Sequence, residues 1–192
     1  MLDPKNSLLH PRTRLERRRF SNLLARVCFA IMMIMSQERP TLVIICGLPG
    51  AGKTTLAKKL AEEMRGVRFC PDEWMQDLGV SLWEEAFRDK LEKRFWKLSQ
   101  ELLKLGQTVI LEYGFWAKSE RNEKLQVARR LGVRTELHYL DISNDELRRR
   151  LKKRGMEGDN EILNGKLEKW AEDFERPGDA EFKLYDNYST DS

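Results

Sequence analysis

The chain alternates between short apolar runs and longer segments in which apolar residues recur at helical spacing. Residues 41–46 form a continuous apolar run that ends at Gly47, which is typical of a strand buried on both faces of a parallel sheet. Residues 53–65 repeat apolar positions every three to four residues and stop before Gly66. This order of strand, glycine loop and helix predicts the first unit of an α/β domain.

More strands and helices are predicted after this unit. We expect strands at residues 67–70, 108–111, 134–140 and 182–185, and helices at residues 82–105, 119–131, 145–153 and 161–174. Strands that alternate with helices are joined by right-handed crossovers and run in parallel. The sequence therefore predicts a three-layer α/β fold with a parallel sheet of about five strands.

Basic charge is concentrated at the N-terminus. The chain has 35 Lys and Arg against 31 Asp and Glu, and residues 1–34 hold seven of the basic and two of the acidic residues. The remainder therefore has 28 basic and 29 acidic residues, so it is close to neutral. A nucleic-acid-binding domain usually carries clustered basic charge, so nucleic acid is not the favoured partner. We predict a basic extension over residues 1–38, disordered or helical, and a folded domain over residues 39–192.

The cysteines and the N-terminal apolar segment bear on the compartment. Cys28, Cys46 and Cys70 show no CxxC spacing and no pairing with histidine, which argues against a disulfide framework or a zinc site. Residues 23–35 are apolar, but Arg26 interrupts them and a membrane-spanning helix needs about 20 apolar residues. We expect a cytoplasmic protein without a membrane partner, and a targeting peptide is the alternative interpretation of the N-terminus.

Residues 47–54 match the pattern GxxxxGK[ST] between the first predicted strand and helix. Glycines let the backbone approach a phosphate closely, so that successive N–H groups and the helix N-terminus face the anion. Lys53 is expected to bridge the β- and γ-phosphates of ATP, and the Thr54 hydroxyl to bind Mg²⁺. The predicted nucleotide-binding residues are Gly47, Leu48, Pro49, Gly50, Ala51, Gly52, Lys53, Thr54 and Thr55.

Two acidic residues directly follow predicted strands, where a parallel sheet presents its ligand crevice. Asp72 comes after the second strand and could accept the proton of an acceptor hydroxyl, or it could cap the next helix. Glu112 ends the apolar run of residues 109–111 and could hold a magnesium-bound water or an acceptor hydroxyl, or it could be a solvated loop residue.

Arginines supply candidate phosphate contacts. Arg150 and Arg154 lie four residues apart on one helical face, next to a glycine-bearing loop, and we predict a lid over residues 147–162. Their charge would offset the charge that develops on the transferred phosphoryl group, although such a run of arginines could also face solvent. Arg121 is predicted to contact the acceptor or a phosphate, or else to lie on the surface.

These features resemble the zeta-toxin and polynucleotide-kinase-like group of P-loop kinases over residues 40–186. The resemblance rests on the phosphate loop, Asp72, the Leu-Glu-Tyr-Gly-Phe-Trp stretch at residues 111–116, Arg121 and the helix at residues 147–154. It implies a P-loop NTP hydrolase or kinase fold with strand order 2-3-1-4-5. Residues 174–177 resemble the loop that packs near adenine in gluconate-kinase-like enzymes, which adds Pro177 to the nucleotide site. Relatives often have aspartate where this chain has Glu112, so the role of Glu112 stays open.

The expected activity is transfer of the γ-phosphate of Mg-ATP to a hydroxyl of a small-molecule or nucleotide acceptor, with Lys53, Asp72, Arg150 and Arg154 as the catalytic residues. The absence of an NKxD stretch and of an LSGGQ-like signature argues against GTPases and transporter ATPases. Two alternatives remain, a nucleotide-dependent switch or ATPase acting on a macromolecule and a nucleic-acid 5′-hydroxyl kinase. Several tryptophans near residues 72–116 either stack on an acceptor ring or pack in the core.

Overall fold

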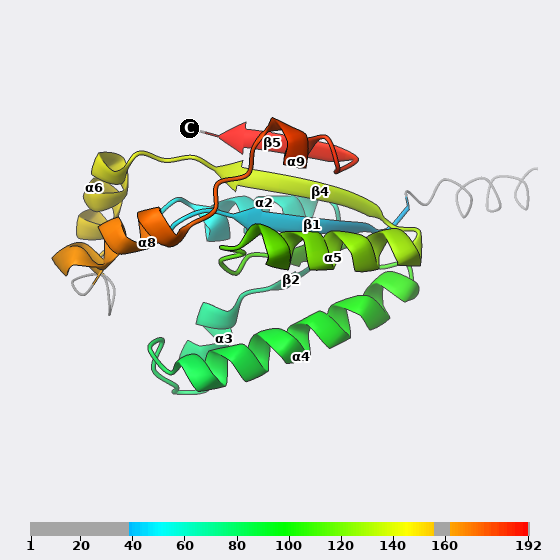
Figure 1. The fold of residues 1–192 in the computed structure, drawn as a ribbon. Helices are drawn as coiled ribbons and strands as arrows, with labels where there is room; N and C mark the ends of the chain where they lie inside the picture. The colour runs from blue at the N-terminus through cyan, green and yellow to red at the C-terminus, as the bar shows by residue number, and fades with distance from the viewer. Residues whose placement is uncertain (1–38, 156–161, 192) are drawn as a thin grey trace, which may run out of the picture. The chain divides into compact units, whose positions relative to one another are not determined.

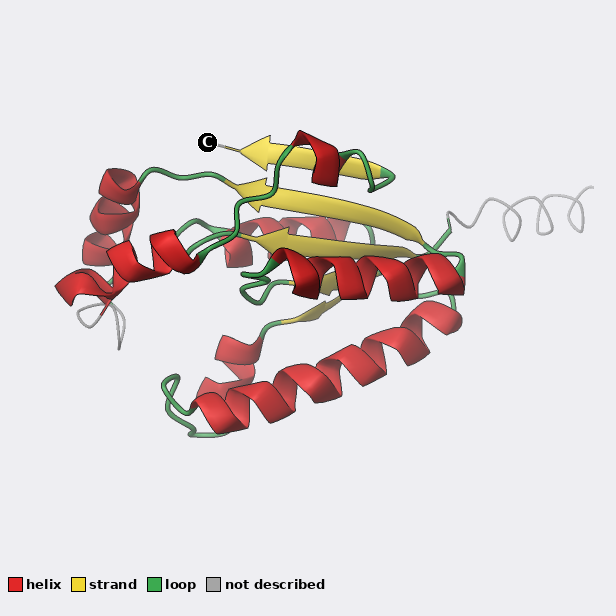
Figure 2. Ribbon diagram, in the orientation of Figure 1, coloured by secondary structure: helices red, strands yellow, loops and turns green. Residues whose placement is uncertain are grey.

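The computed structural model describes residues 39–155 and 162–191, which form a five-stranded sheet with helices on both faces. All strand pairs are parallel and the strand order is β2-β3-β1-β4-β5, as predicted. In Figure 1, helix α2 lies behind the sheet and helix α5 in front of it. Figure 2 shows the same three layers, with strands between helices. The predicted extension at residues 1–38 lies outside the described residues.

The buried centre of the sheet is β1, which pairs with β3 on one side and with β4 on the other. Its apolar residues have no exposed surface, in keeping with the continuous apolar run in the sequence. The strands are β1 (Thr41–Cys46), β2 (Val67–Phe69), β3 (Val109–Leu111), β4 (Arg134–Leu140) and β5 (Asn187–Asp191).

One or more helices connect each strand to the next along the chain. Those in the first half of the domain are α2 (Lys53–Glu63), α3 (Pro71–Asp77), α4 (Glu85–Lys104) and α5 (Lys118–Leu131). Later helices are α6 (Asn144–Arg154), a π-helical turn η1 (Ile162–Lys166), α8 (Leu167–Asp173) and α9 (Asp179–Phe182). No helix among the described residues has the length and apolar character needed to cross a membrane.

One sequence prediction near the C-terminus was wrong. The fifth strand is not at residues 182–185 but at Asn187–Asp191. Phe182 and Tyr185 are buried on one side of a helical turn that includes α9, so their spacing of three residues reflects a helix and not a strand. The helix predicted at residues 161–174 is confirmed over residues 162–173, where the π-helical turn η1 runs directly into α8 and Gly165 has a φ of 111°.

The parallel arrangement brings the carboxyl ends of all strands to one edge of the sheet. The loops after β1, β2 and β3 begin there, at Gly47, Cys70 and Glu112. Helices α6 and α8 lie beyond the same edge (Figure 1). This edge is where parallel α/β sheets bind ligands.

Candidate functional site

The loop after β1 follows a path that its glycines make possible. Gly47, Gly50 and Gly52 have φ angles of 147°, 84° and 105°. A Cβ atom on Gly50 would lie 3.0 Å from Cγ of Leu151 in α6, so the loop approaches that helix closely. Helix α2 begins at Lys53, and its unbonded N–H groups point back along the loop. Pro49, Gly50, Gly52, Lys53, Thr54 and Thr55 line a cavity, whereas Gly47, Leu48 and Ala51 are buried behind them.

The ammonium group of Lys53 is held over this loop. Its Nζ donates hydrogen bonds to the carbonyl oxygens of Gly47, at 2.8 Å, and Leu48, at 3.1 Å. Burial lowers the pKa of Lys53, while the nearby carboxylate of Asp72 acts in the opposite direction. An anion bound in the loop would therefore favour the charged form of this side chain.

Arg150 reaches the phosphate loop from α6. Its Nη1 donates to the carbonyl oxygen of Ala51 at 3.0 Å, and its Nε donates to Glu146 at 2.6 Å. Arg154, one turn later, lines the same cavity. The structure thus brings Arg150 to the loop and Arg154 to the cavity that the loop lines. Residues 156–161 of the predicted lid lie outside the described residues.

Asp72 lies opposite the phosphate loop, in the first turn of α3. The N-cap residue of this helix is Cys70 and not Asp72. The negative charge of Asp72 in the first turn still stabilises the helix through its dipole. Oδ1 of Asp72 is 2.7 Å from Nη1 of Arg88 in α4, and Nη2 of Arg88 donates to the carbonyl oxygen of Leu82 at 3.3 Å. Sequence reasoning missed Arg88, because only the packing of α3 against α4 brings it to Asp72.

Glu112 is buried at the end of β3, with 4% of its surface exposed, so it is not a solvated loop residue. Its Oε1 accepts a hydrogen bond from Nη1 of Arg68 at 2.5 Å, and its Oε2 has no hydrogen-bond partner among the described residues. Burial raises the pKa of Glu112, while the thiol of Cys70 and the guanidinium of Arg68 lower it. Oε2 of Glu112 is therefore a buried acceptor with unused hydrogen-bonding capacity.

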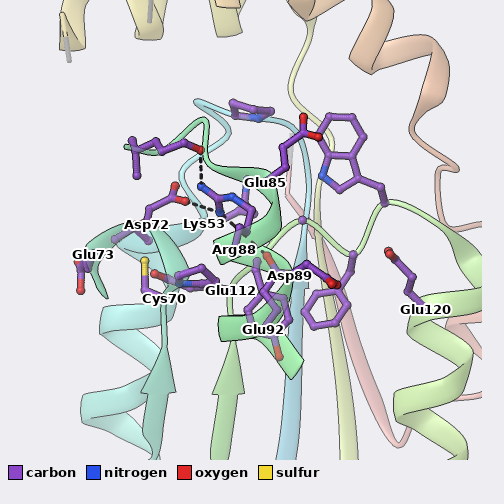
Figure 3. Close-up of a pocket in the computed structure, with 18 of the residues that line it drawn as sticks. Lys53, Cys70, Asp72, Glu73, Glu85, Arg88, Asp89, Glu92, Glu112 and Glu120 are labelled. Carbon is purple, nitrogen blue, oxygen red and sulfur yellow. Dashed lines mark hydrogen bonds and ion pairs between the residues drawn. The ribbon is translucent and has the colours of Figure 1, made fainter. Parts of the chain in front are cut away.

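These side chains line one cavity of about 1420 Å³. Figure 3 shows Lys53, Asp72, Arg88 and Glu112 together in it, with the Asp72–Arg88 contact dashed. The phosphate loop forms one part of the wall, and α4, α5 and the loop after β3 form another. A cradle for an anion and a carboxylate that could accept a proton therefore face a common space.

Comparison with known proteins identifies the family. Residues 42–177 match the family model AAA_33, an AAA domain. The chain belongs to this AAA domain family.

Several solved structures similar to this AAA domain protein are described as kinases. A protein of Chloroflexus aurantiacus assigned as a kinase is 21% identical, with 80% of this chain and 88% of that chain covered and a TM-score of 0.59. The APS kinase CysC of Mycobacterium tuberculosis, solved with AMPPNP and APS, is 15% identical, with 80% and 89% covered and a TM-score of 0.55. A gluconokinase from Sinorhizobium meliloti 1021 is 17% identical, with 80% and 82% covered and a TM-score of 0.53. At these identities the likeness concerns the fold, and these matches do not single out the zeta-toxin-like group.

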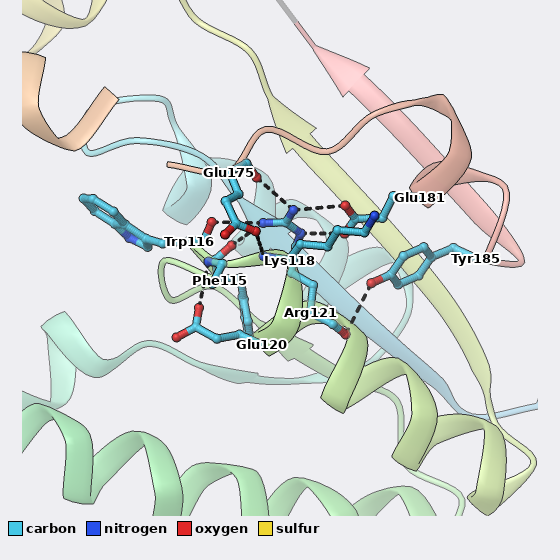
Figure 4. A network of polar contacts seen from close by, with 9 residues as sticks. Phe115, Trp116, Lys118, Glu120, Arg121, Glu175, Glu181 and Tyr185 are labelled. Carbon is cyan, nitrogen blue, oxygen red and sulfur yellow. Dashed lines mark hydrogen bonds and ion pairs between the residues drawn. The ribbon is translucent and has the colours of Figure 1, made fainter. Parts of the chain in front are cut away.

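Arg121 of this AAA domain protein does not reach the cavity, contrary to the hypothesis that it contacts acceptor or phosphate. Its side chain has no exposed surface, so it is not a surface residue either. Figure 4 shows its guanidinium paired with Glu181, through Nε at 2.7 Å and Nη2 at 3.0 Å. It also donates to the carbonyl oxygens of Phe115 at 2.8 Å, Trp116 at 3.3 Å and Glu175 at 2.8 Å. Arg121 therefore joins the loop after β3 to the segment before α9.

The loop after β3 presents aromatic rings to the cavity. Phe115 has a φ of 47°, which is uncommon for a residue with a side chain. A Cβ atom on Gly114 would lie 2.2 Å from Cδ1 and Nε1 of Trp116, so the indole lies directly over this glycine. The Trp116 ring packs edge-on against Trp170 of α8, with 5.5 Å between the ring centroids. Trp170 stacks with Trp83, with 6.2 Å between the ring centroids. These three tryptophans all line the cavity.

Glu92 lies on the α4 side of the cavity. Burial raises the pKa of its carboxyl to about 7. The charge of Arg88 opposes this shift, and the carboxylates of Glu120, Asp72 and Asp89 add to it. Glu92 is therefore a partly buried acid, and its Oε1 lies 4.0 Å from Nη1 of Arg88.

The predicted adenine loop lies at the end of the family match. Pro177 is buried, and it is not among the described residues that line the cavity of about 1420 Å³. Phe174 stacks on Tyr139 of β4, with 5.7 Å between the ring centroids. Nη1 of Arg176 lies 3.6 Å from Oδ1 of Asp141. Contact of Pro177 with adenine stays a prediction.

Proposed function

We propose that this protein transfers the γ-phosphate of ATP to a hydroxyl group of a small-molecule acceptor. The observation that carries the proposal is the single cavity that joins the phosphate loop to the Asp72–Arg88 pair. Its volume of about 1420 Å³ is above the range of roughly 300–1,000 Å³ usual for one small ligand. The cavity has room for a nucleotide and an acceptor side by side.

The nucleotide phosphates would occupy the glycine loop and the N-terminus of α2. Lys53 would exchange its two carbonyl partners for β- and γ-phosphate oxygens, and Arg150, already bonded to Ala51, would lie beside them. Both cations would stabilise the charge that develops on the transferred group. Arg154 lines the same wall and is proposed for the same role.

The donor set of the site also fits Mg²⁺. Thr54 at the start of α2 and Glu112 both line the cavity, and each side chain offers oxygen as a metal ligand. Mg²⁺ commonly takes one or two protein oxygens together with waters and substrate phosphates. No cluster of three or more His, Cys, Asp or Glu suited to a metal occurs among the described residues, which agrees with that arrangement. The ion would supply charge neutralisation on the phosphates.

Asp72 is proposed as the general base. Its carboxylate would take the proton of the acceptor hydroxyl as the oxygen of that hydroxyl forms a bond to the γ-phosphorus, and the bond to ADP breaks. Arg88 would orient the carboxylate through the contact at 2.7 Å. Asp72 is exposed to the cavity, so an acceptor can reach it.

The test is phosphate transfer from γ-labelled ATP by the full chain, with magnesium and pools of metabolites, antibiotics, nucleosides and 5′-hydroxyl oligonucleotides. We expect label on one acceptor class, loss of transfer in Lys53→Ala, and a decrease of about 10²–10⁴-fold in Asp72→Asn. Lys59→Ala is the matched control, since Lys59 lies on the same helix with an exposed side chain and pairs with Glu63.

Two results would favour the alternatives. Release of free phosphate only, unchanged in Asp72→Asn, would support the ATPase or switch hypothesis. Transfer to the oligonucleotides alone would support a nucleic-acid 5′-hydroxyl kinase, which the near-neutral charge of the folded domain does not favour.

A further inference from the structure

Four side chains of alternating charge connect the helix after the phosphate loop to the end of β3. Lys58 of α2 contacts Glu73 of α3, with 2.9 Å between Nζ and Oε1. Arg68 of β2 contacts Glu73 through Nη2 and Glu112 through Nη1, the second at 2.5 Å from Oε1. One guanidinium therefore joins α3 to the buried acid that follows β3.

The register of the sheet places Arg68 beside Glu112. Arg68 lies opposite Ile110 in the pairing of β2 with β3. The N–H of Glu112 donates to the carbonyl oxygen of Phe69 at 3.3 Å, so the ladder continues one residue beyond β3. Side chains two positions apart on a strand point to the same face, which puts Glu112 on the face of Ile110 and Arg68. The ion pair therefore follows from the backbone of the sheet.

Burial makes this ion pair different from a surface pair. The side chain of Arg68 is 17% exposed and that of Glu112 has no exposed surface. A buried carboxylate is costly unless a group of opposite charge accompanies it, and Arg68 supplies that charge. Arg68 binds Oε1, whereas Oε2 of Glu112 has no hydrogen-bond partner among the described residues. The orientation of the Glu112 carboxylate therefore depends on Arg68.

The same guanidinium also constrains the first turn of α3. Glu73 is the neighbour of Asp72 in that turn, and Pro71 before them is buried. Figure 3 shows Asp72 and Glu73 at the start of α3, and Glu112 follows β3, the strand that pairs with β2. The contact of Arg68 with Glu73 ties this turn to β2. Arg68 thus sets where Asp72 and Glu112 lie relative to each other.

We propose that Arg68 is a positioning residue for phosphate transfer, which holds the Glu112 carboxylate and the turn that carries Asp72 in place around the bound nucleotide. Arg68 is not among the described residues that line the cavity, whereas Glu73 and Glu112 are, so it acts through these two acids. This inference rests on the proposed phosphotransfer, in which Glu112 offers oxygen to Mg²⁺ and Asp72 accepts the proton. Residues that orient metal-binding side chains contribute to both metal affinity and rate.

The first test separates kcat from KM. Arg68→Met keeps the apolar part of the side chain and removes the guanidinium. We expect kcat for γ-phosphate transfer to fall about 10–100-fold, with KM for ATP at saturating magnesium nearly unchanged, because the phosphate loop is intact. Arg94→Met is the matched control, since Arg94 is an exposed residue of α4 outside the cavity. An unchanged kcat in Arg68→Met, or an equal loss in Arg94→Met, would overturn the proposal.

A second variant guards against loss of the fold. Arg68→Met leaves the charge of Glu112 buried without a partner, which lowers stability. Glu73→Gln keeps the pair of Arg68 and Glu112, and the side chain of Glu73 is 37% exposed. It removes the charge that holds Arg68 to α3, so we expect a smaller decrease in kcat, about three- to tenfold. If thermal unfolding shows that Arg68→Met is not folded, an unchanged kcat in Glu73→Gln would refute the inference.

A double-mutant cycle shows whether Arg68 acts through Glu112. The variants are Arg68→Met, Glu112→Gln and the two combined. Residues that act as a unit give losses that are not additive in free energy, so the combined loss of kcat should be well below the product of the two single losses. Single losses that multiply would show that the two residues act independently, which contradicts the proposal.

Metal binding separates this inference from the proposed phosphotransfer, because it needs no acceptor. Mn²⁺ is titrated into the full chain with saturating AMPPNP, and free Mn²⁺ is measured by electron paramagnetic resonance. We expect Arg68→Met to weaken Mn²⁺ binding at least about tenfold and Arg94→Met to leave it unchanged. If this is found but no compound is phosphorylated, the phosphotransfer proposal fails and the positioning of Glu112 by Arg68 stands. Equal Mn²⁺ affinity in Arg68→Met and the unmodified chain would overturn the inference even if phosphate transfer occurs.

Discussion

Replacing Glu181 by glutamine tests the buried ion pair that supports the loop after β3. Arg121 has no exposed surface and Glu181 has 5%, and the two side chains form two hydrogen bonds at 2.7 and 3.0 Å. Glu181→Gln keeps the size of the side chain and one acceptor oxygen but removes its charge. The guanidinium of Arg121 would then remain buried without a counter-charge.

The expected loss of stability follows from this geometry. Removing one partner of a buried ion pair costs about 3–5 kcal/mol. Arg121 keeps its hydrogen bonds to three carbonyl oxygens, so we expect the lower end, about 3 kcal/mol of the free energy of unfolding. In a domain of this size each 1 kcal/mol lowers Tm by roughly 2–4 °C, which predicts a decrease of about 6–12 °C.

The assay is urea unfolding of the full chain, monitored by tryptophan fluorescence, which gives the free energy of unfolding. Glu172→Gln on α8 is the control, because its side chain is exposed, and it should change stability by less than about 0.5 kcal/mol. The double variant Arg121→Met/Glu181→Leu removes both charges and should recover part of the loss. A decrease below 1 kcal/mol in Glu181→Gln, or a double variant less stable than either single variant, would refute the reasoning.

Three further predictions concern the cavity. Gly114→Ala places a Cβ atom 2.2 Å from the Trp116 indole, so the ring must move at a cost of about 1–3 kcal/mol. We expect a shifted tryptophan fluorescence emission and a higher KM for the acceptor, with KM for ATP unchanged. Unaltered emission would contradict this prediction. Because burial raises the pKa of Glu92 from its ordinary value of 4.5 to about 7, the native state binds more protons than the unfolded chain between these pH values. The free energy of unfolding should therefore fall by about 1–3 kcal/mol as pH rises through that window, relative to Glu92→Gln in parallel melts, and a constant difference between the two proteins would disprove it. Arg150→Ala should lower kcat/KM for ATP about 100-fold, because it removes a cation beside the phosphate loop. Arg149→Ala is the control: it removes a solvent-exposed partner of the same Glu146 and should leave kcat/KM nearly unchanged. Similar losses in both variants would argue against a phosphate contact of Arg150.

The parts of the fold that local pattern determines could be predicted from the sequence. The strand at residues 134–140 was predicted with the bounds that β4 has, and the phosphate loop was expected between the first strand and helix, where it lies. Both depend on apolar periodicity and glycine placement within a few residues. The order of strands in the sheet is also confirmed, but that expectation came from the family resemblance and not from local pattern.

The parts that depend on distant partners could not be predicted. In the sequence, Arg121 is a charged residue near the start of a predicted helix. Its partner Glu181 is 60 positions away, and only the folded chain shows that both are buried. Arg88 meets Asp72 because α4 packs against α3, which no local spacing encodes. Tyr113 lies in the stretch that carried the resemblance, yet its buried hydroxyl is visible only once α4 and α5 are in place.

The parallel sheet has a further consequence for how this protein can change. The turns at the opposite edge, such as those at Gly106 and Gly132, have open space around the glycine Cα, and neither glycine lines the cavity. Insertions, affinity tags or circularly permuted ends placed there would lengthen a connection without disturbing the chemistry. Evolution and protein engineering can therefore remodel one edge of this sheet for attachment or regulation while the other edge keeps its reaction.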